Sequence, residues 1–203
     1  MIKVILVDLG GVYFTKGTSI GMQKICELTN RPKDIINEIF NSSPRKEGFW
    51  YRKGQLTEKE FWRTAVRRLG VGEDLIPTLK EAWHSSYEPI EGMKDLISKL
   101  RKRFKVVACS GNIKERIDYL DEKYHLKNDF DDFILSYEIG VHKYEPNFYD
   151  VVLERIGVQP EECLCVDDDP EFIDSAQRHG MKAILFQNLA QLESDLKKNG
   201  III

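Results

Sequence analysis

Five short apolar runs, each about the length of one β-strand, recur along the chain and constrain its fold more than any other feature. Between them lie stretches whose apolar residues return every three or four positions, as on one face of a helix. Strand and helix in alternation predict a parallel sheet with helices on both sides, because parallel strands need crossover connections. The runs are residues 2–7, 106–109, 133–135, 163–166 and 183–186.

The first run contains Val4-Ile5-Leu6-Val7, which is apolar at every position. Continuous apolar character is typical of a central strand that is buried on both faces, whereas a half-exposed strand alternates apolar and polar residues. The sequence therefore predicts an α/β fold with a Rossmann-like parallel sheet as its core.

The segment from residue 15 to residue 86 breaks this alternation and is helical throughout by its apolar spacing. We expect it to form a helical cap, inserted into an α/β core domain made of residues 1–14 and 87–203. Thr57 and Glu60 form a capping box, which predicts that a helix begins at Glu58. Trp62 and Trp83 are expected in the apolar core of the cap.

Composition excludes several classes of protein. The 203 residues include 30 Lys and Arg and 33 Asp and Glu, spread along the chain, so the net charge of −3 argues against nucleic acid as a partner. The apolar runs are far shorter than the ~20 residues of a membrane-spanning helix. The N-terminal residues show no export signal, so the cytoplasm is the expected compartment. Cys163 and Cys165 are two apart, and we expect them to be small buried side chains facing the same way.

Polar residues stand directly after the predicted strands. In an open parallel sheet the ligand binds outside the carboxyl ends of the strands, so these residues are the candidates for a site. Lys143 comes shortly before a helix expected to begin near Pro146. The other candidates are Asp8, Leu9 and Gly10 after the first run, Ser110, Gly111 and Asn112 after the second, and Asp167, Asp168 and Asp169 after the fourth.

This set of side chains is the one that phosphoryl transfer through a carboxylate requires. Carboxylate oxygens bind Mg²⁺, while a lysine and a hydroxyl hold phosphate oxygens. Each residue alone is also found as a helix cap or as a solvated side chain. The order Asp, Ser, Lys, Asp-Asp at successive strand ends is the feature that indicates a site.

On these residues the sequence resembles the haloacid dehalogenase-like hydrolase superfamily, in the branch with a helical cap after the first strand. The resemblance covers nearly the whole chain. Asp8 matches the family's nucleophile, Ser110 its Ser/Thr position, and Lys143 its lysine, while Asp167 and Asp168 match its acidic metal ligands.

The resemblance implies a Mg²⁺-dependent phosphatase that acts on a small phosphorylated metabolite. Asp8 is expected to attack phosphorus and to form an aspartyl phosphate. Mg²⁺ is expected at Asp8, Asp168, the backbone carbonyl of Gly10 and, through water, Asp167. The residues expected to bind the phosphoryl group are Ser110, Gly111, Asn112, Lys143 and the amides of Leu9 and Gly10.

Two positions depart from the family pattern. Gly10 stands where the hydrolases usually carry an aspartate that protonates the leaving group, although some of the phosphatases also have Asp-x-Gly. Gly10 predicts that acidic leaving groups react better than alkoxides, and a glycine there is compatible with a positive φ. Phe172 replaces an Asp or Asn that braces the metal, a role that Asp169 or Asp174 is in a position to take.

These departures leave a second hypothesis open, that of a catalytically impaired member that binds a phosphometabolite or a protein partner. A 2-haloacid dehalogenase is disfavoured, because its first motif generally has Tyr at the position of Gly10 and its site holds no metal to offset Asp167-Asp168-Asp169. The sequence leaves open whether the protein is a monomer or a homodimer.

Several remaining polar and aromatic residues are not assigned to the site. A turn in the cap is surrounded by Arg45, Lys46, Trp50, Tyr51 and Arg52. We expect a solvated loop with aromatic packing there, in preference to a surface that closes over substrate. His142 is expected at the surface, although its place beside Lys143 also makes it a candidate for the missing acid. The histidines at 84, 125 and 179 show no metal-ligand spacing.

Overall fold

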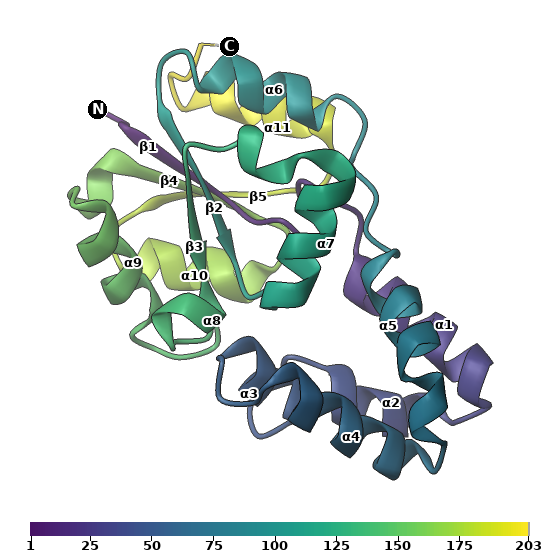
Figure 1. Cartoon of the computed structure of the whole chain (residues 1–203). Helices are drawn as coiled ribbons and strands as arrows, with labels where there is room; N and C mark the ends of the chain where they lie inside the picture. The colour runs from purple at the N-terminus through teal and green to yellow at the C-terminus, as the bar shows by residue number, and fades with distance from the viewer. Residues whose placement is uncertain (203) are drawn as a thin grey trace.

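The computed structural model describes residues 1–202, which form an α/β core with a group of helices at one end (Figure 1). The strands lie in the order β3-β2-β1-β4-β5, and every neighbouring pair is parallel. The predicted α/β fold is confirmed, with strand ends within two residues of the apolar runs. The strands are β1 (Val4–Val7), β2 (Lys105–Ser110), β3 (Asp132–Leu135), β4 (Cys163–Asp167) and β5 (Lys182–Leu185).

Helices cover both faces of the sheet (Figure 1). One layer contains α6 (Met93–Leu100), α7 (Lys114–Tyr124) and α11 (Leu189–Lys198), and the other contains α9 (Phe148–Ile156) and α10 (Pro170–Arg178). The remaining short elements are α8 (Ser136–Ile139) and the 3-10 turns Glu73–Leu75, Leu126–Asn128 and Pro160–Glu162.

Strand β1 is the central strand that its apolar sequence predicts. Ile5 and Val7 pack into the layer of α6, α7 and α11, while Val4 and Leu6 pack into the layer of α9 and α10. Because successive side chains of a strand point to opposite faces, a strand between two helical layers needs apolar residues at every position. Cys163 and Cys165 on β4 lie in the same cluster as Val4, which confirms that they face the same way.

Residues between β1 and α6 form five α-helices, which Figure 1 shows at one end of the sheet. They share an apolar cluster of their own, in which the rings of Phe40, Phe61, Trp62 and Trp83 contact one another edge to face, tilted or stacked. We interpret residues 15–86 as the cap and residues 1–14 and 87–202 as the described part of the core domain. The cap helices are α1 (Gly17–Thr29), α2 (Lys33–Phe40), α3 (Glu47–Arg52), α4 (Glu58–Leu69) and α5 (Ile76–His84).

The capping box at the start of α4 has the geometry that the sequence predicts. The Thr57 hydroxyl accepts a hydrogen bond from the Glu60 amide at 3.3 Å, and the Glu60 carboxylate accepts one from the Thr57 amide at 2.8 Å. Two of the amides that a helix start leaves without partners are therefore satisfied.

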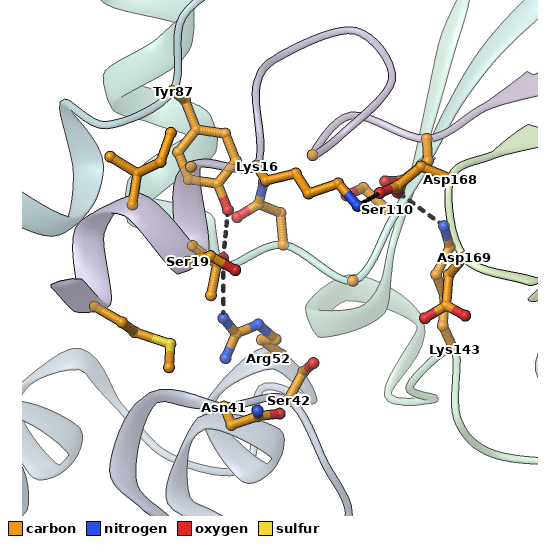
Figure 2. A pocket seen from close by; sticks show the side chains of 18 of the residues that line it. Lys16, Ser19, Asn41, Ser42, Arg52, Tyr87, Ser110, Lys143, Asp168 and Asp169 are labelled. Atoms are coloured by element: carbon orange, nitrogen blue, oxygen red, sulfur yellow. Dashed lines mark hydrogen bonds and ion pairs between the residues drawn. The ribbon is translucent and has the colours of Figure 1, made fainter. Parts of the chain in front are cut away.

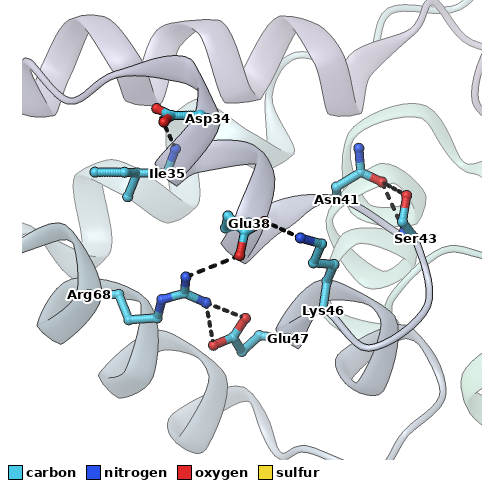
Figure 3. Close-up of polar contacts among 8 residues, drawn as sticks. All are labelled: Asp34, Ile35, Glu38, Asn41, Ser43, Lys46, Glu47 and Arg68. Carbon is cyan, nitrogen blue, oxygen red and sulfur yellow. Dashed lines mark hydrogen bonds and ion pairs between the residues drawn. The ribbon is translucent and has the colours of Figure 1, made fainter.

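The outer surface of the cap carries a network of ion pairs, shown in Figure 3. Arg68 lies 2.6 Å from Glu47, and Lys46 pairs with Glu38. Arg45 is exposed in a loop, as expected, whereas the exposed Trp50 lies in helix α3 and not in a loop. No helix within residues 1–202 is both long and apolar enough to cross a bilayer.

The expectation of a solvated loop is wrong for Tyr51 and Arg52, which are buried in α3, although the aromatic packing expected there is found for Tyr51. The last turn of α3 points inward, so that the Arg52 guanidinium donates to the carbonyls of Phe40 at 3.1 Å and Gly48 at 2.9 Å. Tyr51 packs against Phe61 inside the cap cluster.

Candidate active site

Lys143 lies between two carboxylates at the carboxyl end of the sheet. Its ammonium group is 2.7 Å from Asp8 and 2.6 Å from Asp167. Strands β1 and β4 are paired with Val7 opposite Val166, so the residues that follow them emerge side by side. The strand order changes direction between β1 and β4, which is where open parallel sheets bind ligands.

The two carboxylates and the lysine hold one another in a buried, charged cluster. Burial raises the pKa of Asp8 to about 7, against the opposing effect of Lys143 and with a further rise from Asp167. Burial also raises the pKa of Asp167. Burial disfavours the charge on Lys143, yet Asp167 and Asp8 hold its pKa well above the ordinary lysine value. The lysine is therefore a permanent cation at this point.

Asp168 completes a group of three carboxylates. One oxygen from each of Asp8, Asp167 and Asp168 lies within 4.8 Å of the others. Gly11 makes room for Asp168, since a Cβ on Gly11 would lie 2.4 Å from a carboxylate oxygen, and Gly11 has a φ of +104°. An all-oxygen donor set of this charge fits Mg²⁺, which prefers carboxylates to nitrogen or sulfur ligands.

Lys16 is a residue of this site that the sequence analysis missed. Its ammonium group is 2.7 Å from Asp168, although the lysine side chain is largely exposed. Asp168 raises the pKa of Lys16 through a hydrogen bond and through its charge. Lys16 stands at the start of the cap, where no strand end or motif marks it, so only the folded chain reveals the contact.

The residues that follow β2 lie at the same cavity as the carboxylates and Lys143. Ser110 is buried and lines a cavity that also touches Asp8, Lys143 and Asp168. Gly111 and Asn112 line the cavity too. The side-chain carbonyl of Asn112 accepts hydrogen bonds from Arg116 at 2.9 Å and from the Ile113 amide at 3.1 Å. Its contribution to phosphate binding stays a prediction.

Leu9 and Gly10 contribute backbone groups. The Leu9 side chain is fully buried in the core and does not line the cavity. Among residues 1–202 the amides of Leu9 and Gly10 have no hydrogen-bond acceptor, which leaves them free to donate to a phosphoryl oxygen. Gly10 does not have a positive φ; the left-handed glycine of this loop is Gly11.

Phe172 contacts Lys143 through its ring, whereas an acidic residue at this position would brace the metal. Its ring lies 5.0 Å from the Lys143 nitrogen, a distance at which the ring face attracts the cation. Asp169 caps helix α10 by accepting from the Glu171 amide at 3.0 Å, and it lines the cavity. Asp174 is exposed and does not line the cavity, so it does not replace the missing carboxylate.

The cavity has a volume of about 1060 Å³ and lies between the sheet edge and the cap. Figure 2 shows Arg52, Asn41 and Ser42 of the cap in one part of it, with Asp168 and Lys143 in another. Burial, and to a smaller extent the charge of the nearby Arg116, lowers the pKa of Arg52 to about 10, so Arg52 is a cation at neutral pH.

His142 is buried, and the expectation of a surface histidine is wrong. Phe49 of α3 and Tyr144 cover its ring at 4.9 and 5.4 Å, a contact that the local sequence does not encode. Burial, with the charges of Arg52 and Lys143, lowers the pKa of His142 to about 3. The imidazole is therefore neutral at physiological pH and is a poor source of a proton.

Known proteins are similar to this chain in sequence and in fold. Relatives in sequence include flavin mononucleotide hydrolase 1 of Arabidopsis thaliana, 28% identical over 152 residues that span 74% of this chain and 61% of that protein. D-ribitol-5-phosphate phosphatase of Bacteroides thetaiotaomicron is 26% identical over 213 residues, which cover 97% of each chain.

Solved structures share the fold. A haloacid dehalogenase family enzyme of Bacteroides thetaiotaomicron, in complex with magnesium and inorganic phosphate, superposes with a TM-score of 0.75 at 25% identity, covering 95% of this chain and 99% of that one. L-2-haloacid dehalogenase of Xanthobacter autotrophicus gives 0.66 at 19% identity, over 100% and 85%. The family model for the haloacid dehalogenase-like hydrolases matches residues 2–180, and the chain therefore belongs to that family.

Proposed function

We propose that this protein is a Mg²⁺-dependent phosphatase of small phosphorylated metabolites, with Asp8 as the nucleophile. The observation that carries the proposal is the position of Lys143 between Asp8 and Asp167, with Asp168 beside them. A dianionic phosphate enters such a site only if cations offset its charge, and the lysine supplies one of them.

Each residue has a distinct task in the proposed reaction. The Asp8 carboxylate attacks phosphorus, the bond to the leaving oxygen breaks, and an aspartyl phosphate forms, which water then hydrolyses. Lys143, Ser110 and the amides of Leu9 and Gly10 hold the phosphoryl oxygens in place while this happens.

The metal would be held by carboxylate oxygens of Asp8 and Asp168, by the backbone carbonyl of Gly10 and, through water, by Asp167. When bound, Mg²⁺ supplies positive charge next to the transferring phosphoryl group. Three carboxylates so close repel one another, and a divalent cation removes that repulsion.

The cavity supports a metabolite as substrate. Its volume of about 1060 Å³ exceeds what a phosphate needs, so a leaving group of appreciable size fits beneath the cap. Two relatives are named for the hydrolysis of flavin mononucleotide and of ribitol 5-phosphate, which are small phosphorylated compounds. We expect a cytoplasmic enzyme that is a monomer or a homodimer.

Gly10 and Phe172 favour a second candidate, an impaired member that binds a phosphometabolite or a protein without turnover. The dehalogenase alternative stays disfavoured, because three carboxylates would repel the acid substrate of such an enzyme.

A screen of phosphate monoesters with and without Mg²⁺ tests the proposal. The wild-type protein should release phosphate only with Mg²⁺, and Asp8→Asn should abolish release. Asp174→Asn, a change at an exposed aspartate outside the cavity, is the matched control and should retain wild-type rates. Turnover that survives in Asp8→Asn would refute the covalent mechanism, and binding of phosphate esters without any turnover would favour the second candidate.

A further inference from the structure

An alkyl phosphate needs a proton on its leaving oxygen, and the usual donor position holds no side chain at Gly10. His142 is buried and neutral, so it does not fill the gap. The side chain that does occupy the space over Gly10 is Tyr87, which follows the cap and lines the cavity.

Two glycines make room for the Tyr87 ring. A Cβ on Gly10 would lie 3.3 Å from Cε1 of Tyr87 and 3.7 Å from its hydroxyl oxygen. A Cβ on Gly17 would lie 2.1 Å from the ring. The phenol is therefore held at the position from which a residue 10 side chain would reach the leaving group. Only 3% of Tyr87 is exposed.

The Tyr87 hydroxyl belongs to a chain of hydrogen bonds, drawn in part in Figure 2. It lies 2.6 Å from the Thr18 hydroxyl, which also lines the cavity and receives a long hydrogen bond of 3.5 Å from Arg52. Arg116 donates to the Tyr87 oxygen at 3.2 Å. Either hydroxyl of the Tyr87–Thr18 pair can donate, and the bond accepted from Arg116 leaves the Tyr87 proton free to point to Thr18.

Arg116 is the unusual member of this chain. It is fully buried, lies 4.1 Å from the Trp83 ring and 4.7 Å from the Tyr87 ring, and has no carboxylate partner among residues 1–202. Two of its nitrogens, Nε and Nη2, have no hydrogen-bond partner in the described part of the chain. A buried charge without a counter-ion is costly, and a negative charge on the Tyr87 oxygen would offset it.

We propose that Tyr87, acting through the Thr18 hydroxyl, protonates the leaving group in place of the side chain that Gly10 lacks. This proposal rests on the proposed phosphatase function. As the Asp8 oxygen bonds to phosphorus and the bond to the leaving oxygen breaks, Thr18 gives its proton to that oxygen and takes one from Tyr87. The resulting tyrosinate lies beside Arg116.

The second half of the reaction returns the proton. Water attacks the phosphorus of the aspartyl phosphate, and its proton passes through Thr18 to the tyrosinate. The bond between phosphorus and Asp8 breaks, which releases inorganic phosphate and restores the Asp8 carboxylate and the neutral Tyr87. Atoms, charge and protons balance over the cycle.

The test compares two leaving groups, because a purely structural Tyr87 would not distinguish them. Nitrophenolate departs without a proton, whereas the alkoxide of ribitol 5-phosphate needs one. Tyr87→Phe removes only the hydroxyl. It should lower kcat for ribitol 5-phosphate by ~10²-fold or more and change kcat for p-nitrophenyl phosphate by less than about threefold. Thr18→Val should show the same pattern.

Two further variants sharpen the result. Tyr124→Phe is the matched control. The Tyr124 hydroxyl donates to the Tyr87 carbonyl at 3.3 Å and takes no part in the proton transfer from Tyr87 through Thr18, which we call the relay, so both rates should stay unchanged. Gly10→Asp in the Tyr87→Phe background should restore ribitol 5-phosphate turnover by about tenfold or more, because it adds a carboxylic acid beside the remaining ring, which has to shift by a few tenths of an ångström.

Each other outcome decides against the relay. Equal losses on both substrates in Tyr87→Phe, or no loss on either, would overturn it and leave the phosphatase proposal standing. If the wild-type protein hydrolyses the aryl ester and not ribitol 5-phosphate, the relay is likewise overturned and the phosphatase proposal stands. Failure of the wild-type protein on both esters with Mg²⁺ would overturn the relay and the proposed function together.

Discussion

Gly11→Ala tests how the loop after β1 shapes the metal site. Gly11 has a φ of +104°, in a region that side chains other than glycine rarely adopt. Its added Cβ would lie 2.4, 2.5 and 2.6 Å from the Oδ2, Cγ and Oδ1 atoms of Asp168. The substitution therefore acts on the backbone and on one proposed metal ligand at once.

Two effects of different size are expected. A residue forced into this backbone region costs about 1–3 kcal/mol of unfolding free energy. In a chain of this length each kcal/mol lowers Tm by roughly 2–4 °C. To relieve the contact, the Asp168 carboxylate has to move by about 1 Å, because ordinary van der Waals contact begins near 3.4 Å. Displaced support of a metal ligand typically weakens affinity by about 10–100-fold.

Calorimetric titration with Mg²⁺, well below Tm, separates the two effects when Gly157→Ala serves as the control. Gly157 ends α9 with a φ of +69°, and nothing lies within 4 Å of its Cβ position. Both variants should lose stability, and only Gly11→Ala should bind Mg²⁺ at least about tenfold more weakly. An equal Mg²⁺ affinity in the two variants would refute the assignment of Asp168 as a ligand supported by Gly11.

Three further predictions concern charge and capping. In chelator at pH 8, Asp8→Asn should raise the free energy of unfolding by at most about 4 kcal/mol, because the native carboxyl ionises only near its raised pKa of about 7. The gain should vanish as the pH falls toward 4, and urea unfolding at pH 8 and 4.5 that shows equal gains would contradict the argument. Lys143→Met leaves Asp8 and Asp167 without their cation, so urea unfolding in chelator should show a loss of about 3–5 kcal/mol that Mg²⁺ partly restores; a loss below about 1 kcal/mol speaks against the ion pairs. Thr57→Ala should cost about 1 kcal/mol in the same measurement and leave phosphatase activity unchanged; unaltered stability would argue against the capping box.

The sheet and its polar edge were predictable because they follow from local sequence and from one rule of parallel packing. Asp8, Lys143 and Asp167 are far apart in the chain, yet strand ends of a parallel sheet collect at one edge. The structure places the Lys143 ammonium group 2.7 Å from Asp8 and 2.6 Å from Asp167. The capping box of α4 was equally local, since Thr57 and Glu60 meet within one helical turn.

The cap side of the cavity was not predictable from spacing. Arg52 and Tyr51 stand beside exposed residues in the sequence, and only the packing of α3 turns them inward. His142 is covered by Phe49 from that same helix. Burial of this kind depends on where the cap lies against the core. The spacing of apolar residues within the cap or within the core does not predict that position.

Gly10 shows most clearly what the sequence alone does not predict about the site. A glycine at the donor position predicts, from the sequence, an enzyme that depends on good leaving groups. The folded chain gives that glycine a neighbour, since the Tyr87 ring packs 3.3 Å from where its Cβ would be, and Gly17 clears the other side of the ring. Neither glycine alone points to a tyrosine many residues away. Because a missing side chain also leaves space, the catalytic competence of such a site depends on which residue fills that space.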